Sequence, residues 1–213
     1  MNWWEISALI TGVIYIVFEI RQKNFMWVVG IATSSASMWV FFRQGLYASF
    51  GLNTYYFITA FIGLWQWARF KRKVVADVPA TSDMPAKASS GDVIVLNRLR
   101  WQVVAASATV CIAGTLALSS GMDYLYGKGL LAENPMSLLD SAATMLSVVA
   151  TWWLIKAYIQ QWWLWIVADL LSVILCLTQE MWWMAALYIA YVIAAVYGLG
   201  YWKTRGVYLS DTQ

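Results

Sequence analysis

The chain has 213 residues, of which 62% are hydrophobic, 16% are aromatic and only 12% are charged. Soluble domains carry about 25% charged residues, and one of this length could not remove so much apolar surface from water. The composition therefore excludes a soluble protein and indicates a polytopic membrane protein. The net charge of +3 reflects the loops and gives no sign of nucleic-acid binding. Histidine is absent, so the sequence predicts no metal or cofactor site.

Seven stretches are long and apolar enough to cross a bilayer core of about 30 Å, which takes about 20 residues per helix. The first is a span rather than a signal peptide, because it lacks a basic start and a small-residue cleavage site and continues into Glu19 and Arg21. The sequence thus predicts an all-α integral membrane protein with seven transmembrane helices. In chain order the predicted helices are 2–20, 25–42, 50–68, 101–119, 138–155, 162–179 and 182–202.

Two of the connections are long. Residues 69–100 are polar and contain Pro79 and Pro85, so we expect a flexible cytoplasmic linker. Residues 120–137 contain glycine and a proline and predict an irregular external loop. Residues 101–119, which lie between these two connections, are expected to form a linker helix. Residues 203–213 are expected to form a cytoplasmic tail.

The distribution of Lys and Arg predicts the orientation of the chain. Of the 14 such residues, Arg43 and Lys128 fall on one side of the membrane and the other 12 on the opposite side. Positive charge is retained in the cytoplasm, so we expect the N-terminus outside and the C-terminus inside, in the inner membrane of a bacterium. The 12 are Arg21, Lys23, Arg69, Lys71, Arg72, Lys73, Lys87, Arg98, Arg100, Lys156, Lys203 and Arg205.

The N-terminal and C-terminal parts of the chain resemble each other in sequence, which indicates an internal repeat. A shift of 135 residues aligns 27–67 with 162–202 without a gap and gives eleven identities in 41 positions, among them Trp27 with Trp162 and Gly63 with Gly198. Because the matching helices run in the same direction, the sequence predicts two parallel three-helix repeats, 1–68 and 138–202. With the linker helix this gives a 3+1+3 plan, which is one of the repeat plans of secondary transporters.

Polar residues inside the predicted spans form stripes. Trp162, Trp165 and Asp169 share one face of their helix, and Asp169 lies at its centre. A carboxylate at the middle of a span costs roughly 2.5–3.5 kcal/mol, and no Lys or Arg lies at the same depth, so we expect Asp169 to line a polar site. Other stripes contain Asn53 with Tyr56, Asp140 with Thr144, Ser147 and Thr151, and Tyr188 with Tyr191.

Other interpretations apply to some of these residues. Ser, Thr and Gly commonly serve helix packing in membranes, which is our expectation for Ser172, Gly63 and Gly198. Trp67 and Trp202 lie near predicted cytoplasmic ends and are expected to be interfacial residues. Cys111 and Cys176 lie in apolar runs and are expected to be small buried residues rather than metal ligands or a disulfide.

An acid between indole rings, with amide and hydroxyl groups nearby, would suit a flat, cationic and hydroxylated molecule. The segments that carry these residues, 24–67 and 140–173, resemble the PnuC family of bacterial vitamin transporters. The shared motifs are an LYA element before the third helix, G-x-x-x-W at the end of that helix, D-S-x-x-x-x-L-S-x-x-A, and W-x-x-W-I-x-x-[ND]. The resemblance covers nearly the whole chain except residues 69–100.

The resemblance implies a SWEET-like fold, a homotrimer, and uptake of nicotinamide riboside or, in some branches, thiamine. Uptake would be facilitated diffusion through alternating access, followed by trapping through a cytoplasmic vitamin kinase. It also implies a substrate site at Asn53, Asp140, Ser147, Trp165, Asp169 and Tyr188, to which the stripes add Tyr56 and Thr151. Riboside importers tend to have Asn where this chain has Asp169, which keeps thiamine as the alternative substrate.

Two other classes of protein are considered. Asp140 and Asp169 could form the carboxylate pair of an intramembrane enzyme, but the sequence has no matching motif and no nucleophile, so we do not expect an enzyme. A substrate-binding subunit of an ATP-driven importer would need a coupling motif, and none is apparent. No Gly-rich phosphate loop is present either.

Overall fold

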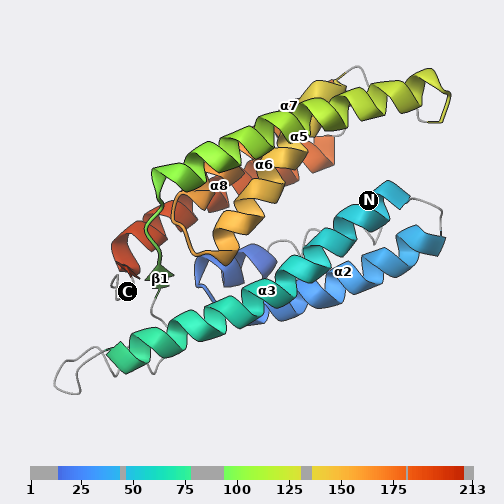
Figure 1. Ribbon diagram of the computed structural model, residues 1–213. Coiled ribbons are helices and arrows are strands. Elements are labelled where there is room, and N and C mark those ends of the chain that lie inside the picture. Colours follow the sequence, from blue (N-terminus) through green and yellow to red (C-terminus); the bar gives the residue numbers. More distant parts are fainter. Residues whose placement is uncertain (1–13, 44–46, 78–93, 131–135, 181, 209–213) are drawn as a thin grey trace. The chain divides into compact units, whose positions relative to one another are not determined.

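The computed structural model describes residues 14–43, 47–77, 94–130, 136–180 and 182–208 (Figure 1). The first helical segment is visible as residues 14–20, and the rest of the predicted span 2–20 lies outside the described residues. The elements that follow are α2 (Phe25–Arg43), α3 (Tyr47–Asp77), β1 (Ile94–Leu96), α5 (Trp101–Gly127), α6 (Ser137–Ile155), α7 (Gln161–Thr178), α8 (Trp182–Arg205) and β2 (Gly206–Tyr208).

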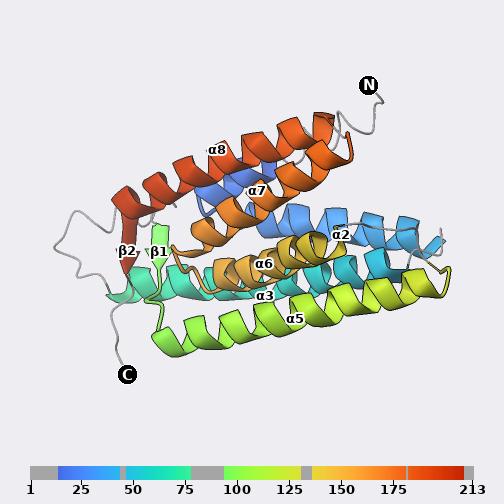
Figure 2. The same cartoon turned by 90° about the horizontal axis from the view of Figure 1, so that it is seen from above.

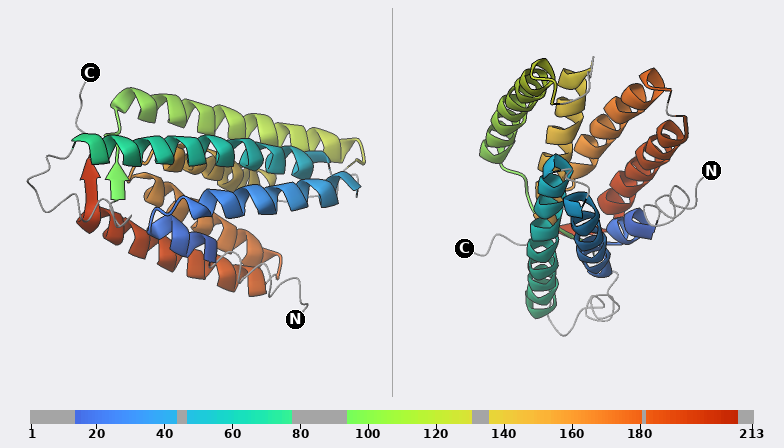
Figure 3. Two further views of the ribbon diagram at one scale, coloured as in Figure 1. Left: turned by 90° about the horizontal axis from the view of Figure 1, so that it is seen from below. Right: turned by 90° about the vertical axis from the view of Figure 1, so that its right-hand side faces the viewer.

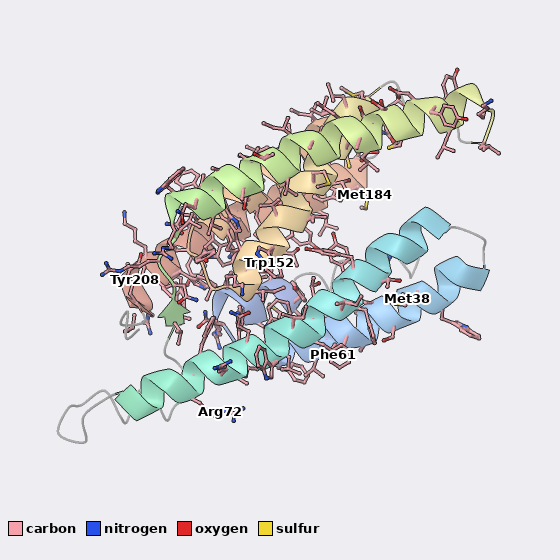
Figure 4. The ribbon with its side chains drawn as sticks, viewed as in Figure 1. Met38, Phe61, Arg72, Trp152, Met184 and Tyr208 are labelled. Carbon is pink, nitrogen blue, oxygen red and sulfur yellow. The ribbon has the colours of Figure 1, made fainter. Side chains whose placement is uncertain are left out.

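The predicted helical architecture is confirmed in its main features. Seven helical segments occur in the described residues, and α6, α7 and α8 begin or end within three residues of the predicted bounds. Four described helices are long and apolar enough to cross a membrane: Trp101–Gly127, Ser137–Ile155, Gln161–Thr178 and Met184–Arg205. Many of their large apolar side chains are exposed, as a lipid-facing surface requires; Trp152 and Met184 are examples (Figure 4).

The structure differs from the prediction in the connections. Helix α3 continues through the basic residues 69–73 to Asp77, and α5 continues to Gly127, so parts of the predicted linker and external loop are helical. Lys and Arg are good helix formers, and a hydropathy pattern detects only the part of a helix that is apolar. The strand β1 also lies inside the predicted flexible linker.

The chain divides into two compact units. The first consists of residues 1–97, 154–157 and 201–213, and the second of residues 98–153 and 158–200. In the first unit, α2 and α3 lie side by side (Figure 1). Residues 14–20 join them at Gly30, where an added Cβ would lie 3.6 Å from the Cβ of Ala60 and 3.9 Å from the ring of Tyr15.

A short parallel sheet lies at one end of the first unit. Strand β1 pairs with β2 in the register Ile94 with Gly206, Val95 with Val207 and Leu96 with Tyr208 (Figures 2 and 3). All three residues of β1 are buried to at least 99%. A segment expected to be flexible is therefore a fixed part of this unit.

The second unit contains α5, α7 and most of α6 and α8. Helix α5 contacts α6 through the indole of Trp153, whose Nε1–H donates to the Ser107 hydroxyl at 3.0 Å. Helix α7 contacts α8 where the indole of Trp162 lies against Gly198; a Cβ added there would approach the ring to 2.6 Å. In the first unit the indole of Trp27 lies against Gly63 in the same way, at 2.5 Å.

Two turns have the same backbone structure 135 residues apart. Gln22 and Ala157 both have left-handed backbones, with φ of 48° and 56°, and 157 minus 22 is 135. Four backbone hydrogen bonds around each residue also coincide at this spacing. They are Gln22 N to Glu19 O with Ala157 N to Leu154 O, Lys23 N to Phe18 O with Tyr158 N to Trp153 O, Met26 N to Lys23 O with Gln161 N to Tyr158 O, and Trp27 N to Asn24 O with Trp162 N to Ile159 O.

The indole–glycine contacts generate a stability prediction. Gly63→Ala and Gly198→Ala should each lower the free energy of unfolding by about 1–3 kcal/mol, because the new methyl group would overlap a buried indole. Gly200→Ala is the matched control, since nothing lies within 4 Å of a Cβ at that position. Thermal unfolding in detergent measures the effect. Equal melting temperatures for Gly198→Ala and Gly200→Ala would show that the contact is not tight.

Candidate functional site

One face of α7 carries a polar stripe along its whole length. Gln161, Trp165, Asp169, Ser172 and Cys176 follow one another at intervals of three or four residues, which places them on one side of the helix. Gln161 is fully buried, and Asp169 and Cys176 are each only 7% exposed. The opposite face carries Trp163, Val167, Leu170 and Ile174, all of which are exposed apolar residues. The stripe therefore faces protein, and the opposite face is suited to lipid.

Side chains from three helices meet at the middle of this stripe. Tyr188 of α8 lies near Ser172, Asp169 and Cys176 of α7, and it is also within electrostatic range of Asp140 of α6. Tyr191, one turn along α8, is also within the electrostatic range of Asp169. The two tyrosine rings pack edge to face, with centroids 6.1 Å apart. The second unit thus brings together three predicted site residues: Asp140, Asp169 and Tyr188.

Asp169 is buried without a compensating cation. Its side chain is 7% exposed, and no Lys or Arg among the described residues acts on the carboxylate. A buried charge without a partner is costly, and proteins keep one inside a membrane chiefly where it meets a ligand, an ion or water. This site is therefore suited to a cationic ligand.

The hydroxyl groups on α6 and α7 bond within their own helices. Ser147 donates to the carbonyl of Ala143 at 2.9 Å, and Thr151 donates to the carbonyl of Ser147 at 2.8 Å. Ser172 donates to the carbonyl of Ala168 at 2.9 Å. Their donors are thus used locally, as expected for helix-packing residues, and their oxygens remain able to accept a hydrogen bond.

Gln161 is a site candidate that the sequence did not reveal. Neither Nε2 nor Oε1 of its buried amide has a hydrogen-bond partner in the described part of the chain, and the buried Nε1 of Trp165 has none either. An unpaired buried amide costs about 1–3 kcal/mol, so such groups are normally satisfied by a ligand or by water. Gln161 lies four residues before Trp165, and this spacing could have placed it on the same helix face. A glutamine at the start of a helix does not by itself indicate a binding site.

The remaining predicted residues, Asn53 and Tyr56, lie on α3 in the first unit and are partly buried. The ring of Tyr56 packs against that of Tyr55 at 5.6 Å. Tyr15 lies within electrostatic range of both Tyr56 and Glu19, and Glu19 is 4% exposed. The first unit thus has a buried polar cluster of its own.

The prediction that Trp67 and Trp202 are interfacial residues is wrong. They are 1% and 0% exposed, and their indole nitrogens donate hydrogen bonds to backbone carbonyls. The two residues lie at the ends of apolar runs, which suggested a membrane interface. The sequence does not show that their indoles bond to carbonyls of distant segments.

Fold and site define a class: a helical membrane protein with buried polar groups suited to a small cationic molecule. Comparison with known proteins identifies the family. The family described as nicotinamide mononucleotide transporter matches residues 2–204. The chain therefore belongs to this family, the PnuC family that its motifs indicated, and it is a membrane transporter and not an enzyme.

Individual relatives agree with this assignment. The nicotinamide riboside transporter PnuC of Neisseria mucosa is 26% identical over 94% of this chain and 72% of its own length. The transporter of the same name from Escherichia coli K12 is 23% identical over 95% of this chain and 85% of its own. The crystal structure of the vitamin B3 transporter PnuC has a TM-score of 0.65, with 23% identity over 95% of this chain and 81% of that chain. That structural likeness shows the shared fold.

The unpartnered amide of Gln161 leads to a prediction on stability. In the register of the repeat, Gln161 corresponds to Met26, which is equally buried (161 minus 26 is 135). Gln161→Met should raise the free energy of unfolding of the ligand-free protein by about 1–3 kcal/mol, because it removes an unsatisfied buried amide. Thermal unfolding would measure the change, with the exposed Gln179→Met as the control. A lower melting temperature would show that the amide has a structural partner.

Proposed function

We propose that the chain imports a cationic vitamin, nicotinamide riboside, across the bacterial inner membrane. The observation that carries this proposal is the buried carboxylate of Asp169, which no cation of the described protein neutralises. A pyridinium ring would supply the missing charge. The names of two relatives, which are nicotinamide riboside transporters, support the same substrate.

The spacing along α7 suits this molecule. Gln161, Trp165 and Asp169 are four residues apart, so successive residues lie about 6 Å apart along the helix axis. We propose that the amide of Gln161 pairs with the carboxamide, that Trp165 stacks on the ring, and that Asp169 accepts hydrogen bonds from the ribose hydroxyls. We also assign Tyr188 of α8 and Asp140, Ser147 and Thr151 of α6 to this site. We propose that Asn53 and Tyr56 of α3 take part in substrate binding as well.

We further propose the 3+1+3 plan of two parallel repeats, 1–68 and 138–202, with residues 101–119 within the linker helix α5. The equivalent indole–glycine contacts and the two identical turns support it, because their positions differ by 135 residues in each case. The substrate would cross by facilitated diffusion as the repeats rock between outward-open and inward-open states.

Other parts of the proposal follow from the resemblance and from the charges of the loops. They are an external N-terminus, a cytoplasmic C-terminus, a homotrimer, and a cytoplasmic kinase that traps the vitamin by phosphorylation. Thiamine is the alternative substrate, because it is also a flat cation and because Asp169 replaces the Asn of typical riboside importers.

A binding panel tests the site. The purified protein should bind nicotinamide riboside more tightly than thiamine or riboflavin, with the fluorescence of Trp165 among the signals. Asp169→Asn keeps the shape of the side chain but removes its charge, and should weaken binding at least about tenfold, the loss expected for a hydrogen bond to a charged group. The exposed Glu180→Gln is the matched control. Tighter binding of thiamine would show that thiamine, not nicotinamide riboside, is the substrate. Unchanged binding by Asp169→Asn would show that Asp169 is not part of the site.

A further inference from the structure

Two buried tryptophans join segments that belong to opposite halves of the repeat. Trp67, near the middle of the long helix α3, donates from Nε1 to the carbonyl of Leu154 at the end of α6, at 3.1 Å. Trp202, near the end of α8, donates from Nε1 to the carbonyl of Ile20 at the end of the first helical segment, at 2.8 Å. The two indoles also contact each other, with ring centroids 6.4 Å apart.

These two bonds are reciprocal. Trp67 and Trp202 are equivalent in the repeat (202 minus 67 is 135), and Ile20 corresponds to Ile155, the residue after Leu154. Each half therefore donates from its last helix to the end of the first helix of the other half. Both accepting carbonyls lie in the last turn of a helix, and the carbonyl of Leu154 also accepts from the N–H of Ala157 at 2.9 Å. Any motion that separates these helix ends breaks both bonds.

A strap of four residues, 94–97, crosses the same region. The side chain of Gln22 forms two bonds with the backbone of Val95: Nε2 donates to the carbonyl at 2.8 Å, and Oε1 accepts from the N–H at 2.7 Å. Lys71 donates to the carbonyl of Gln22 at 2.8 Å. Gln22 is 2% exposed. The strap is thus bound to the turn of the first half.

The other side of the strap is bound to the second half. The backbone N–H of Asn97 donates to the carbonyl of Ala157 at 3.1 Å, and its side-chain Nδ2 donates to the carbonyl of Lys156 at 2.7 Å. Strand β1 also pairs with β2, which directly follows α8 (Figure 3). The strap therefore connects Gln22 and Ala157, the two equivalent turn residues with left-handed backbones.

We propose that Trp67, Trp202 and the strap form a gate that is closed in this structure and that opens when the vitamin leaves for the cytoplasm. The inference rests on the proposed function. The basic residues at this end, Arg21, Lys23, Lys156, Lys203 and Arg205, place the gate on the cytoplasmic side by the positive-inside rule. The contact of Gln22 with the strap and the two indole bonds release on opening, while the strap stays with the second half through β2 and Asn97.

A reporter cysteine behind the gate tests this inference. Thr151 is 6% exposed and lies one turn before Leu154 on α6, so Thr151→Cys should become reactive only when the gate opens. The background carries Cys111→Ala and Cys176→Ala, which removes both native thiols. A membrane-impermeant maleimide is added to inverted membrane vesicles, which expose the cytoplasmic side, and to vesicles of native orientation.

Gln22→Leu and Trp202→Phe each remove hydrogen bonds and keep most of the side-chain volume. Trp202→Phe should raise the labelling rate in inverted vesicles about fivefold, the population shift expected from the loss of one neutral hydrogen bond, and Gln22→Leu, which loses two, should raise it at least as much. Trp65→Phe is the matched control, because Trp65 is 61% exposed and lies two residues before Trp67. Trp67→Phe provides a second gate variant in case Trp202→Phe fails to fold, and the melting temperature separates opening from unfolding.

The outcomes divide clearly. Faster labelling at an unchanged melting temperature, confined to inverted vesicles and to the gate variants, supports the gate. Equal rates in the parent and in all gate variants overturn it, provided that the reporter cysteine labels fully after denaturation, and so does an equal increase in Trp65→Phe. If the wild-type protein binds no vitamin, the proposed function fails, but the labelling rates still decide whether these contacts close the path.

Discussion

The packing of an indole against a glycine is the constraint on which two helix pairs of this protein depend, α2 with α3 and α7 with α8. At Gly63 and at Gly198 a single methyl group would overlap the ring of a buried tryptophan, so the helices approach more closely than larger side chains would allow. Inside a membrane there is little hydrophobic driving force between helices, and close contact supplies much of the attraction. Each of these tryptophans closely follows a turn with a left-handed residue, Gln22 or Ala157. The position of the turn and the packing of the helix pair are therefore set together.

This packing gives the polar residues their environment. With α7 held against α8 at its first turn, the polar stripe of α7 faces protein, and Asp169 lies near Tyr188 and Tyr191. A carboxylate that lacks a cation in this setting favours a cationic ligand over a neutral one. The same reasoning applies to Gln161, whose buried amide lacks both a donor and an acceptor among the described residues. The stripe thus combines negative charge, an aromatic face and an amide within one helix.

Much of this could be predicted from the sequence, because helices that cross a membrane have a strong apolar pattern. The bounds of α6 to α8 and the burial of Asp169 followed from that pattern. Strand β1 did not, because its pairing with β2 joins residues more than 100 positions apart and three residues carry too little signal. Trp67 and Trp202 were misplaced at an interface, because their carbonyl partners come from distant segments. The pairing of Gln22 with Val95 was equally invisible, because it joins a turn to a linker.

The central claim is that this chain alone moves a vitamin cation down its gradient, and uptake into liposomes tests it most directly. Purified protein in liposomes should equilibrate labelled nicotinamide riboside across the membrane without ATP, and the final internal concentration should equal the external one. Liposomes without protein provide the baseline. Uptake that never exceeds this baseline with any cationic vitamin, or that requires ATP and a partner protein, would contradict the account.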